Sequence, residues 1–287
     1  MAVEMNKKLI IGLLSSTVVI SRFLFAAWGS DASLTANPKR KISSEHKSDN
    51  KMKVEIWSDV MCPFCYIGKK KFETAWNEFA AKNKVEIEWK SFQIMPGLQT
   101  QPDRSIHEVL VDQKRISLEQ AKQLNGYATQ MAKDVGLTYN FDKTVPVNTL
   151  KAHQFQHFAK ANGKGVEAEE LMFKAYFTDG KNIDDMDTLV ELGKSIGLDG
   201  SALKSALEKQ TYLNAIKNDI QEADKIGVNG VPFFVFNRKR AVSGAQDPQV
   251  FLDMLQKSFE EWRNENPQTK LEVVEGAVCK PDGTCDQ

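Results

Sequence analysis

Three segments between residues 54 and 89 show the first changes of pattern along the chain. Residues 54–58 (Val-Glu-Ile-Trp-Ser) have the composition of a β-strand that runs into a turn. From about Tyr66 to Asn83, apolar residues recur at helical spacing, and residues 85–89 (Val-Glu-Ile-Glu-Trp) alternate as a half-buried strand. The pattern therefore predicts a β-α-β unit.

A long helical region follows, from about Ser105 to Ile226. Its predicted breaks contain glycine, the usual residue after a helix end. They are Asn125-Gly126, Asp134-Val135-Gly136, Asn162-Gly163, Asp179-Gly180, Ile196-Gly197 and Asp199-Gly200. Strand composition returns at residues 233–236 and again, after a turn, at residues 241–243. Asp247-Pro248 then has the N-cap and first-turn chemistry of a last helix.

The order of these elements is β-α-β, a helical segment and then β-β-α. This is the order of a thioredoxin-like α/β fold with an α-helical domain inserted between its two halves. We predict that residues 52–102 and 227–266 make up the thioredoxin-like domain, with residues 103–226 as the inserted helical domain. The remaining parts are residues 1–28 as a signal-like or anchor segment, 29–51 as a flexible linker and 267–287 as a C-terminal tail.

The N-terminal segment has the pattern of a secretory signal. Asn6-Lys7-Lys8 precedes an apolar run over residues 9–20, and Ala26-Ala27 supplies small residues for cleavage. Arg22 within the apolar stretch disfavours a transmembrane helix. We expect an extracytoplasmic location, periplasmic or secreted, with membrane contact only through this segment if it stays uncleaved. The alternative is a cytoplasmic protein with a disordered extension.

Composition describes a soluble globular protein, since 41% of the residues are hydrophobic and 26% are charged. The formal net charge is zero, so no overall field attracts nucleic acid, and we expect no nucleic-acid partner. The basic run Lys69-Lys70-Lys71 is expected on the solvated face of the first helix.

Cys62-Pro63-Phe64-Cys65 is the strongest chemical signal, because two cysteines separated by two residues can carry redox chemistry. The motif lies between the first predicted strand and its helix, which places Cys62 at a helix N-terminus. Unpaired N–H groups and the helix dipole favour a thiolate there, and the thiolate is the nucleophilic form. Pro63 suits the first helical turn, because it has no N–H to leave unsatisfied. A strand, CxxC and helix in succession point to thiol–disulfide exchange.

The four cysteines fall into two close pairs, Cys62/Cys65 and Cys279/Cys285. Four thiolates can bind zinc, but the pairs lie more than two hundred residues apart and the first is at a helix start, so we expect no metal. Residues 281–283 (Pro-Asp-Gly) form a turn that brings the second pair within bridging distance. This pair is either a local disulfide of the tail or a second redox pair that exchanges with the first.

Gly230-Val231-Pro232 directly precedes the third predicted strand, which is expected beside the CxxC helix. We predict a cis peptide bond between Val231 and Pro232 at this position. The backbone of Val231 then faces an extended substrate chain, opposite Cys62.

Further motifs occur in a fixed order with the CxxC sequence over about residues 52–262. They are residues 59–68 (Asp-Val-Met-Cys-Pro-Phe-Cys-Tyr-Ile-Gly), 91–96 (Ser-Phe-Gln-Ile-Met-Pro), 147–153 (Val-Asn-Thr-Leu-Lys-Ala-His), 174–177 (Lys-Ala-Tyr-Phe), 227–234 (Gly-Val-Asn-Gly-Val-Pro-Phe-Phe) and 242–246 (Val-Ser-Gly-Ala-Gln). In these motifs the chain resembles the DsbA-type thiol–disulfide oxidoreductases, most closely their FrnE-like branch.

The resemblance implies a thioredoxin-like fold with a helical insertion, Cys62 as the attacking cysteine, Cys65 as the resolving cysteine and Pro232 in cis. It also implies that Cys279 and Cys285 are the second pair that members of this branch often carry near the C-terminus. The best-known members are cytoplasmic, whereas this chain has a signal-like N-terminus, so the location does not carry over. Glutathione-dependent isomerases of the superfamily typically have serine at the first cysteine, and this chain keeps both cysteines.

We expect a substrate thiolate to attack the Cys62 sulfur while Cys65 leaves, after which a second substrate thiol releases the oxidised substrate. The partners are then protein thiols or disulfides and a partner that recycles the pair. No cofactor is expected, and glutathione is a candidate redox partner. Two other functions stay open: a glutathione-dependent isomerase or transferase on the same fold, and a chaperone-like binder of unfolded proteins.

The residues expected to line the site pocket are Trp57, Asp59, Pro63, Phe64, Val231 and His153. Trp57 and Asp59 directly precede the CxxC motif, and His153 belongs to one of the resemblance motifs. His153 and His157 are four residues apart on a predicted helix, a spacing that can bind metal. Because no third ligand is evident, we expect ordinary histidines at the surface or between the domains.

Overall fold

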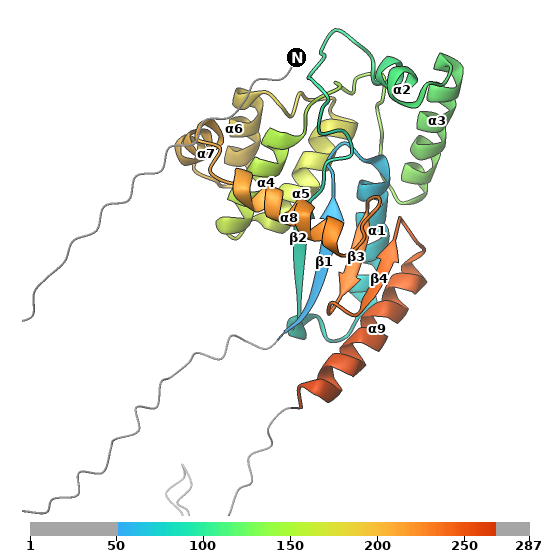
Figure 1. Ribbon diagram of the computed structural model, residues 1–287, viewed down its shortest axis with the longest axis vertical. Helices are drawn as coiled ribbons and strands as arrows, with labels where there is room; N and C mark the ends of the chain where they lie inside the picture. The colour runs from blue at the N-terminus through green and yellow to red at the C-terminus, as the bar shows by residue number, and fades with distance from the viewer. Residues whose placement is uncertain (1–50, 268–287) are drawn as a thin grey trace, which may run out of the picture. The chain divides into compact units, whose positions relative to one another are not determined.

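The computed structural model describes residues 51–267. In this part of the chain four strands form one sheet in the order β2-β1-β3-β4 (Figure 1). Their bounds are Met52–Ser58 for β1, Val85–Ser91 for β2, Phe233–Phe236 for β3 and Arg240–Ser243 for β4. β1 and β2 are parallel, whereas β3 is antiparallel to both β1 and β4. The first predicted strand is therefore a central strand of the sheet.

Strand β1 is buried on both faces, because helices cover both sides of the sheet. Ile56 points to one face and lies opposite Trp89 of β2 and Phe234 of β3 in the strand register. Trp57 points to the other face, where it packs with Val235. A strand buried on both sides has a nearly continuous apolar composition rather than a strict alternation.

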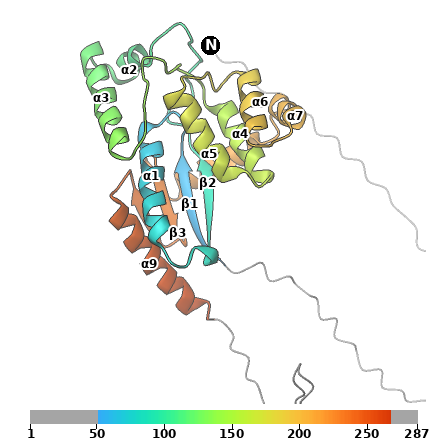
Figure 2. The same ribbon diagram turned by 180° about the vertical axis from the view of Figure 1, so that it is seen from behind.

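Helices α1 (Pro63–Glu78) and α9 (Pro248–Glu265) cover the face of the sheet to which Ile56 points (Figure 2). The two helices and the sheet enclose an aromatic core. The ring of Phe251 in α9 lies 5.7 Å from that of Phe72 in α1 and 4.6 Å from that of Phe234 in β3, measured between centroids. Large apolar rings of this kind dominate the energetics of a core.

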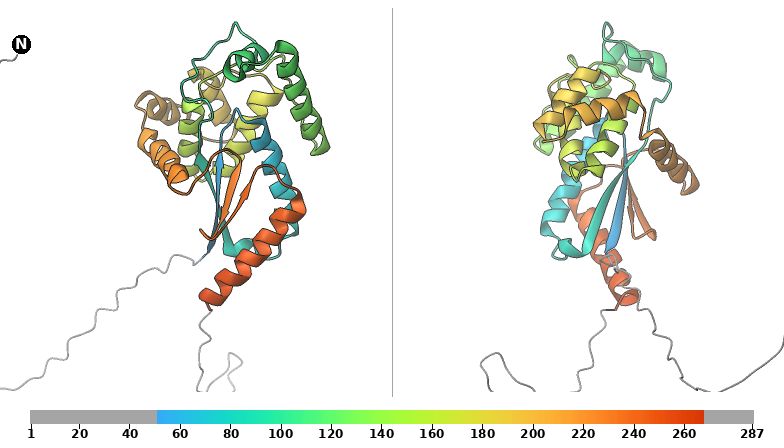
Figure 3. Two further views of the ribbon diagram at one scale, coloured as in Figure 1. Left: turned by 45° about the vertical axis from the view of Figure 1, so that its right-hand side comes forward. Right: turned by 90° about the vertical axis from the view of Figure 1, so that its left-hand side faces the viewer.

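The inserted region between β2 and β3 gathers at the end of the sheet where β1 ends (Figure 3). Its helices are α2 (Ile106–Lys114), α3 (Leu118–Asp134), α4 (Leu150–Ala161), α5 (Gly165–Phe173), α6 (Met186–Ser195), α7 (Gly200–Glu208) and α8 (Leu213–Lys225), with a π-helical turn at Lys174–Thr178. Capping boxes begin α2 at Ser105 and α3 at Ser117. The insertion has its own hydrophobic cluster, which also takes in the first turns of α1.

The ends of two predicted helices differ from the sequence-based expectation. α1 ends at Glu78 rather than near Asn83, because Phe79 is extended, and a short 3₁₀ turn follows at Lys82–Lys84. Asn125-Gly126 does not break the helix but lies within α3. The side-chain amide of Asn125 is buried there and lies 3.0 Å from Nδ1 of His107. This contact keeps the backbone helical across Asn125-Gly126, a pair of residues that otherwise favours a turn.

Lys69 is not on a solvated face as the sequence suggested. Its side chain is 2% exposed, and its ammonium group lies 2.5 Å from carboxylate oxygens of both Glu73 and Glu170. Glu73 is one helical turn away, but Glu170 belongs to α5. A buried ammonium group needs such partners, and the second one is invisible in the local sequence.

Residues 1–50 and 268–287 lie outside the described part, and with them the signal-like segment, nearly all of the predicted linker and Cys279/Cys285. Between residues 51 and 267, no helix combines the length and the apolar character needed to cross a membrane.

Two neighbouring substitutions in α9 test the aromatic core between α1, α9 and the sheet. Phe251→Ala removes a fully buried ring and is expected to lower the free energy of unfolding by about 3–5 kcal/mol. Val250→Ala, one residue earlier at a side chain that is 37% exposed, is expected to change it by less than about 0.5 kcal/mol. Urea unfolding of both variants measures the difference, and similar effects for the two would show that Phe251 is not a core residue.

Candidate active site

The CxxC motif lies where β1 passes into α1, and the two cysteines differ in exposure. Cys62 is the N-cap of α1, and Pro63 is the first helical residue, as predicted. The Cys62 N–H donates to the Asp59 carbonyl at 3.0 Å, and the Cys65 N–H donates to the Cys62 carbonyl at 3.0 Å. Both cysteines are free thiols, with Cys62 6% exposed and Cys65 fully buried. Cys62 is thus the more accessible of the two cysteines.

The loop before β3 lies against Cys62. The Val231–Pro232 peptide bond is cis, in agreement with the sequence-based expectation. The thiol of Cys62 donates to the Val231 carbonyl, with Sγ and O 3.5 Å apart. Pro232 packs on α1 at Gly68, where an added Cβ would come within 2.9 Å of the proline Cγ. Gly68 therefore allows the close approach between this loop and the CxxC helix.

The Cys65 sulfur lies in a closed environment. Burial raises the pKa of its thiol well above the ordinary value, and the neighbouring Cys62 sulfur raises it further. The backbone N–H of Asp59 and the hydroxyl of Ser58 lower the pKa by hydrogen bonding to the sulfur, but they do not offset the burial. A negative charge on Cys65 is therefore costly.

Asp59 holds the turn before the motif through its carboxylate. One carboxylate oxygen accepts from the Ile94 N–H at 2.8 Å, and the other accepts from the Met61 N–H at 3.5 Å. His153 of α4 is 1% exposed, and its Nε2 lies 3.4 Å from this carboxylate. Asp59 and His153, each expected to line the pocket, thus lie next to each other in a buried position. Burial also raises the pKa of the Tyr176 hydroxyl, and the Asp59 charge raises it further.

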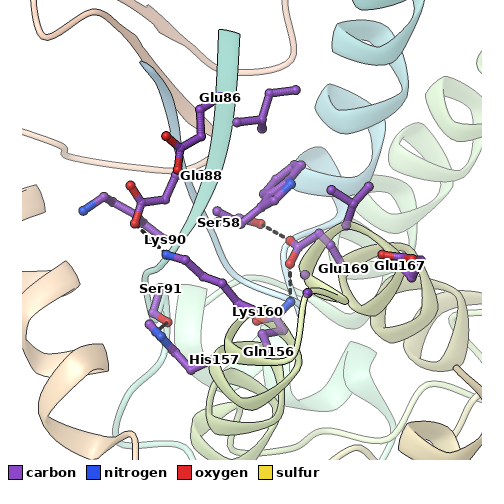
Figure 4. A pocket seen from close by; sticks show the side chains of 15 residues that line it. Ser58, Glu86, Glu88, Lys90, Ser91, Gln156, His157, Lys160, Glu167 and Glu169 are labelled. Atoms are coloured by element: carbon purple, nitrogen blue, oxygen red, sulfur yellow. Dashed lines mark hydrogen bonds and ion pairs between the residues drawn. The ribbon is translucent and has the colours of Figure 1, made fainter. Parts of the chain in front are cut away.

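A buried carboxylic acid that the sequence did not reveal lies beside these residues. Glu169 of α5 is 2% exposed and accepts a hydrogen bond from the Ser58 hydroxyl at 3.2 Å and another from the Gln156 side-chain amide (Figure 4). Burial raises the pKa of Glu169 to about 7, against the lowering effect of His153 and Lys69. One feature of the sequence could have indicated this burial: Glu169 falls on the apolar face of α5.

The adjacent Glu170 has the opposite character. Burial alone raises its pKa, but hydrogen bonds from Lys69, Lys70 and Tyr66 lower it to about 2. Two neighbouring glutamates of one helix are thus held in different protonation states near neutral pH, because only one of them has cationic hydrogen-bond partners.

A cavity of about 220 Å³ opens between β2 and the helices α4 and α5 (Figure 4). Ser58 and Glu169 line it, together with Gln156, His157 and Lys160 of α4. His157 does not join His153 in a common site. Its Nε2 lies 3.2 Å from the carboxylate of Asp219 and 3.1 Å from Oγ of Ser91.

The other residues predicted for the pocket lie in different places. Phe64 is 36% exposed beside Cys62, and the Pro63 carbonyl accepts a hydrogen bond from the Tyr139 hydroxyl at 2.7 Å. Trp57 is fully buried on the face of the sheet opposite α1 and α9, where its indole N–H donates to the Asp219 carbonyl. Its contribution to the site is indirect, because its cluster also packs against Val231.

The fold and the paired cysteines define a protein of the thioredoxin superfamily. Residues 53–256 match the profile of the DSBA-like thioredoxin domain, and the chain belongs to this family. The prediction of a thioredoxin-like fold with a helical insertion, and of DsbA-type membership, is thereby confirmed.

Similar proteins support this family assignment. The uncharacterized protein YwbO of Bacillus subtilis strain 168 is 34% identical over 204 residues, which cover 69% of this chain and 92% of YwbO. The crystal structure of a probable DsbA oxidoreductase from Streptomyces coelicolor is 32% identical, with a TM-score of 0.68, covering 82% of this chain and 99% of that one. The cytosolic disulfide reductase DsbM from Pseudomonas aeruginosa shares the fold at 16% identity, with a TM-score of 0.53, covering 72% and 99%.

Two helical glycines test the contact between α1 and the loop before β3. Gly68→Ala introduces a Cβ against Pro232 and is expected to lower the free energy of unfolding by about 1–3 kcal/mol. Gly126→Ala, in the middle of α3 with no atom within 4 Å of the added Cβ, is expected to raise it by about 0.5–1 kcal/mol. Denaturant unfolding of both variants gives the two signs, and a gain for Gly68→Ala would contradict the close contact.

Glu169 should make stability depend on pH. Because its pKa rises from 4.5 to about 7 on folding, the folded state is destabilised progressively as pH rises from about 4.5 to about 7. Glu169→Gln removes this titration, so its free energy of unfolding relative to wild type should rise by on the order of 3 kcal/mol between about pH 4.5 and about pH 8. Urea unfolding across this range measures it. Glu167→Gln, at an exposed position of the same helix, should give no such gain, and a flat difference for Glu169→Gln would contradict the shifted pKa.

Proposed function

We propose that this chain is a thiol–disulfide oxidoreductase that exchanges disulfides with protein thiols through Cys62 and Cys65. The observation that carries the proposal is the asymmetry of the pair. Cys62 lies at the N-cap of α1, where a helix dipole stabilises negative charge, and it faces the Val231 carbonyl. Cys65 is fully buried behind it. Membership of the DSBA-like family supports the same chemistry.

The roles of the two sulfurs follow from this asymmetry. In the oxidised protein a substrate thiolate attacks Sγ of Cys62, a new S–S bond forms, and the bond to Cys65 breaks. A second thiolate of the substrate then attacks the substrate sulfur of the mixed disulfide and releases Cys62. Two electrons have passed from the substrate dithiol to the CxxC pair. The reverse sequence reduces a substrate disulfide, and a redox partner returns the pair to its starting state.

Protein substrates fit the surroundings of Cys62 better than a small thiol alone. Phe64 is exposed beside the cysteine, and Ile94, which Asp59 ties to the CxxC turn, is 40% exposed. The Val231 backbone borders the same sulfur, so an extended substrate chain can lie along it. Assignment to the FrnE-like branch, the extracytoplasmic location and a role for glutathione as redox partner remain predictions.

Trapping of mixed disulfides tests the function. In a Cys279→Ser/Cys285→Ser background, reduced Cys65→Ser should accumulate covalent adducts with an unfolded protein substrate that carries disulfides. The Cys62 thiolate attacks a substrate disulfide, one substrate sulfur leaves as a thiolate, and the mixed disulfide persists because the resolving sulfur is gone. Cys62→Ser should form at least about tenfold less adduct, since the remaining Cys65 is buried. Non-reducing electrophoresis and mass spectrometry identify the linked cysteine.

Other outcomes would support the competing functions. Wild-type activity of the Cys65→Ser variant with glutathione and a small substrate would favour an isomerase or transferase. Suppression of substrate aggregation by the Cys62→Ser/Cys65→Ser variant, without any adduct in Cys65→Ser, would favour a chaperone. Adducts at Cys65 instead of Cys62 would overturn the assigned roles.

A further inference from the structure

We propose that Tyr139 is a positioning residue for the thiol–disulfide exchange. Its hydroxyl acts through the Pro63 carbonyl and strengthens an N–H group with which the first turn of α1 stabilises a thiolate at Cys62. The inference rests on the proposed function, and it assigns part of the redox balance of the CxxC pair to the inserted helical region.

The contact between Tyr139 and the CxxC motif is a short hydrogen bond. The Tyr139 hydroxyl donates to the carbonyl oxygen of Pro63 at 2.7 Å. Pro63 is the first residue of α1, and in a regular helix this carbonyl also accepts from the N–H four residues further on. A carbonyl oxygen has two lone pairs and can accept both bonds. The Tyr139 hydroxyl therefore adds a second bond without disturbing the helix.

The Pro63 carbonyl and the Phe64 N–H belong to the same peptide group. A hydrogen bond accepted by the oxygen polarises this group and makes its N–H a stronger donor, by roughly 10–30% per bond. The first N–H groups of a helix have no partner within it. Cys62 is the N-cap of α1, so its side chain can accept from the N–H of the second or third helical residue, Phe64 or Cys65. The polarised N–H is thus one of the two that a Cys62 thiolate can use.

The thiol and the thiolate of Cys62 need different partners. In the structure Cys62 is a free thiol that donates to the Val231 carbonyl, with Sγ and O 3.5 Å apart. A thiolate has no proton to donate and accepts from N–H groups instead. The Cys65 N–H already donates to the Cys62 carbonyl at 3.0 Å, so the Phe64 N–H is the less engaged of the two donors. Tyr139 therefore strengthens an interaction that the thiolate makes and the thiol does not.

Tyr139 belongs to the segment between α3 and α4, which is fixed to the π-helical turn at Lys174–Thr178. The Asn140 N–H donates to the Phe177 carbonyl at 2.7 Å, and the Asn140 side-chain amide donates to the Thr178 carbonyl at 2.6 Å. Short π-helical turns of this kind often occur at functional sites. Here the turn anchors the backbone on both sides of the bond that carries the tyrosine.

Stacked rings hold the Tyr139 side chain. Its ring centroid lies 4.6 Å from that of Phe177 and 6.2 Å from that of Tyr66, in stacked geometry, and 5.6 Å from that of Phe141, edge to face. The residue is only 6% exposed. In a close-packed cluster the ring cannot turn its hydroxyl away from Pro63 without displacing its neighbours. The insertion thus places this hydroxyl at a fixed point of the CxxC turn.

The Tyr139 hydroxyl stays protonated over the pH range in which a thiol ionises. Burial raises the pKa of this hydroxyl well above its ordinary value, and negative charge at Cys62, Tyr66 and Cys65 raises it further. The hydroxyl therefore keeps donating to Pro63 while Cys62 gains and loses its proton.

The expected consequence is a more oxidising disulfide. Only the reduced form of the pair contains a Cys62 thiolate, so a group that stabilises this thiolate favours the reduced form. Removing the Tyr139 hydroxyl should shift the balance of the pair towards the Cys62–Cys65 disulfide.

Tyr139→Phe tests the proposal, because it keeps the ring and removes the hydroxyl. The full-length chain carries Cys279→Ser and Cys285→Ser, so that only the CxxC pair reacts. In the reduced protein the pH midpoint at which the ultraviolet absorbance of the thiolate appears should rise by about 0.3–0.6 unit. At a pH above both midpoints, the equilibrium constant for disulfide formation with glutathione should rise by the corresponding factor of roughly two to four.

A stronger donor at the same place should have the opposite effect. A ring-fluorinated tyrosine at position 139 is a more acidic phenol of nearly the same size, and it should lower the midpoint below that of the wild type. Tyr66→Phe is the matched control. It removes a hydroxyl from the same ring cluster, but this hydroxyl donates to Glu170 at 2.7 Å and not to the motif. Its midpoint should equal that of the wild type.

Two results would overturn the role of Tyr139. One is an unchanged midpoint in both the Tyr139→Phe and the fluorinated protein, and the other is an equal rise in Tyr139→Phe and Tyr66→Phe, which would indicate a general effect of packing. The fluorinated protein keeps the ring and the hydroxyl, so its shift decides the question even if Tyr139→Phe does not fold. If the wild-type pair forms no reversible disulfide with glutathione, the proposed exchange reaction fails, whereas the order of the midpoints still decides whether Tyr139 acts on Cys62.

Discussion

Helix α1 has to fit two hydrophobic clusters at once, and the position of the cysteines follows from this constraint. Its first turns, with Cys65 and Ile67, belong to the hydrophobic cluster of the inserted helices. Phe72 and Ala75, further along, belong to the aromatic core that α1 and α9 form with the sheet. A helix packed in this way along its whole length cannot slide without opening one of the clusters. Cys62 is consequently held at a fixed place against the loop before β3.

The same packing explains why several polar side chains near the cysteines bind groups from distant parts of the chain. Buried polar groups need partners, and here the partners come from other segments. Asp59 binds the Ile94 N–H after β2, and Lys69 binds Glu170 of α5. Each of these contacts joins α1 or its preceding turn to a distant part of the chain, so they fix the insertion relative to the sheet as well as satisfying the buried groups.

The sequence predicts the parts of this arrangement that depend on local chemistry. The CxxC motif after a strand, Pro63 in the first helical turn and Pro232 before β3 could all be placed from neighbouring residues. The burial of Lys69 could not, because its partner Glu170 lies 101 residues further along the chain. The Ser58–Glu169 contact spans 111 residues and was missed for the same reason. The side to which Trp57 points could not be predicted either, because a strand buried on both sides gives no alternation from which to infer its direction.

Both ends of the described chain emerge on the side of the sheet opposite the cysteines. Lys51 and Asn266 line the same hollow, together with Arg238 of the turn between β3 and β4. The seven residues of β1 separate this hollow from the CxxC turn by about 23 Å. An attachment made at either end of the described chain, at Lys51 or Asn266, therefore lies on the far side of the sheet from Cys62 and leaves the CxxC turn facing the solution.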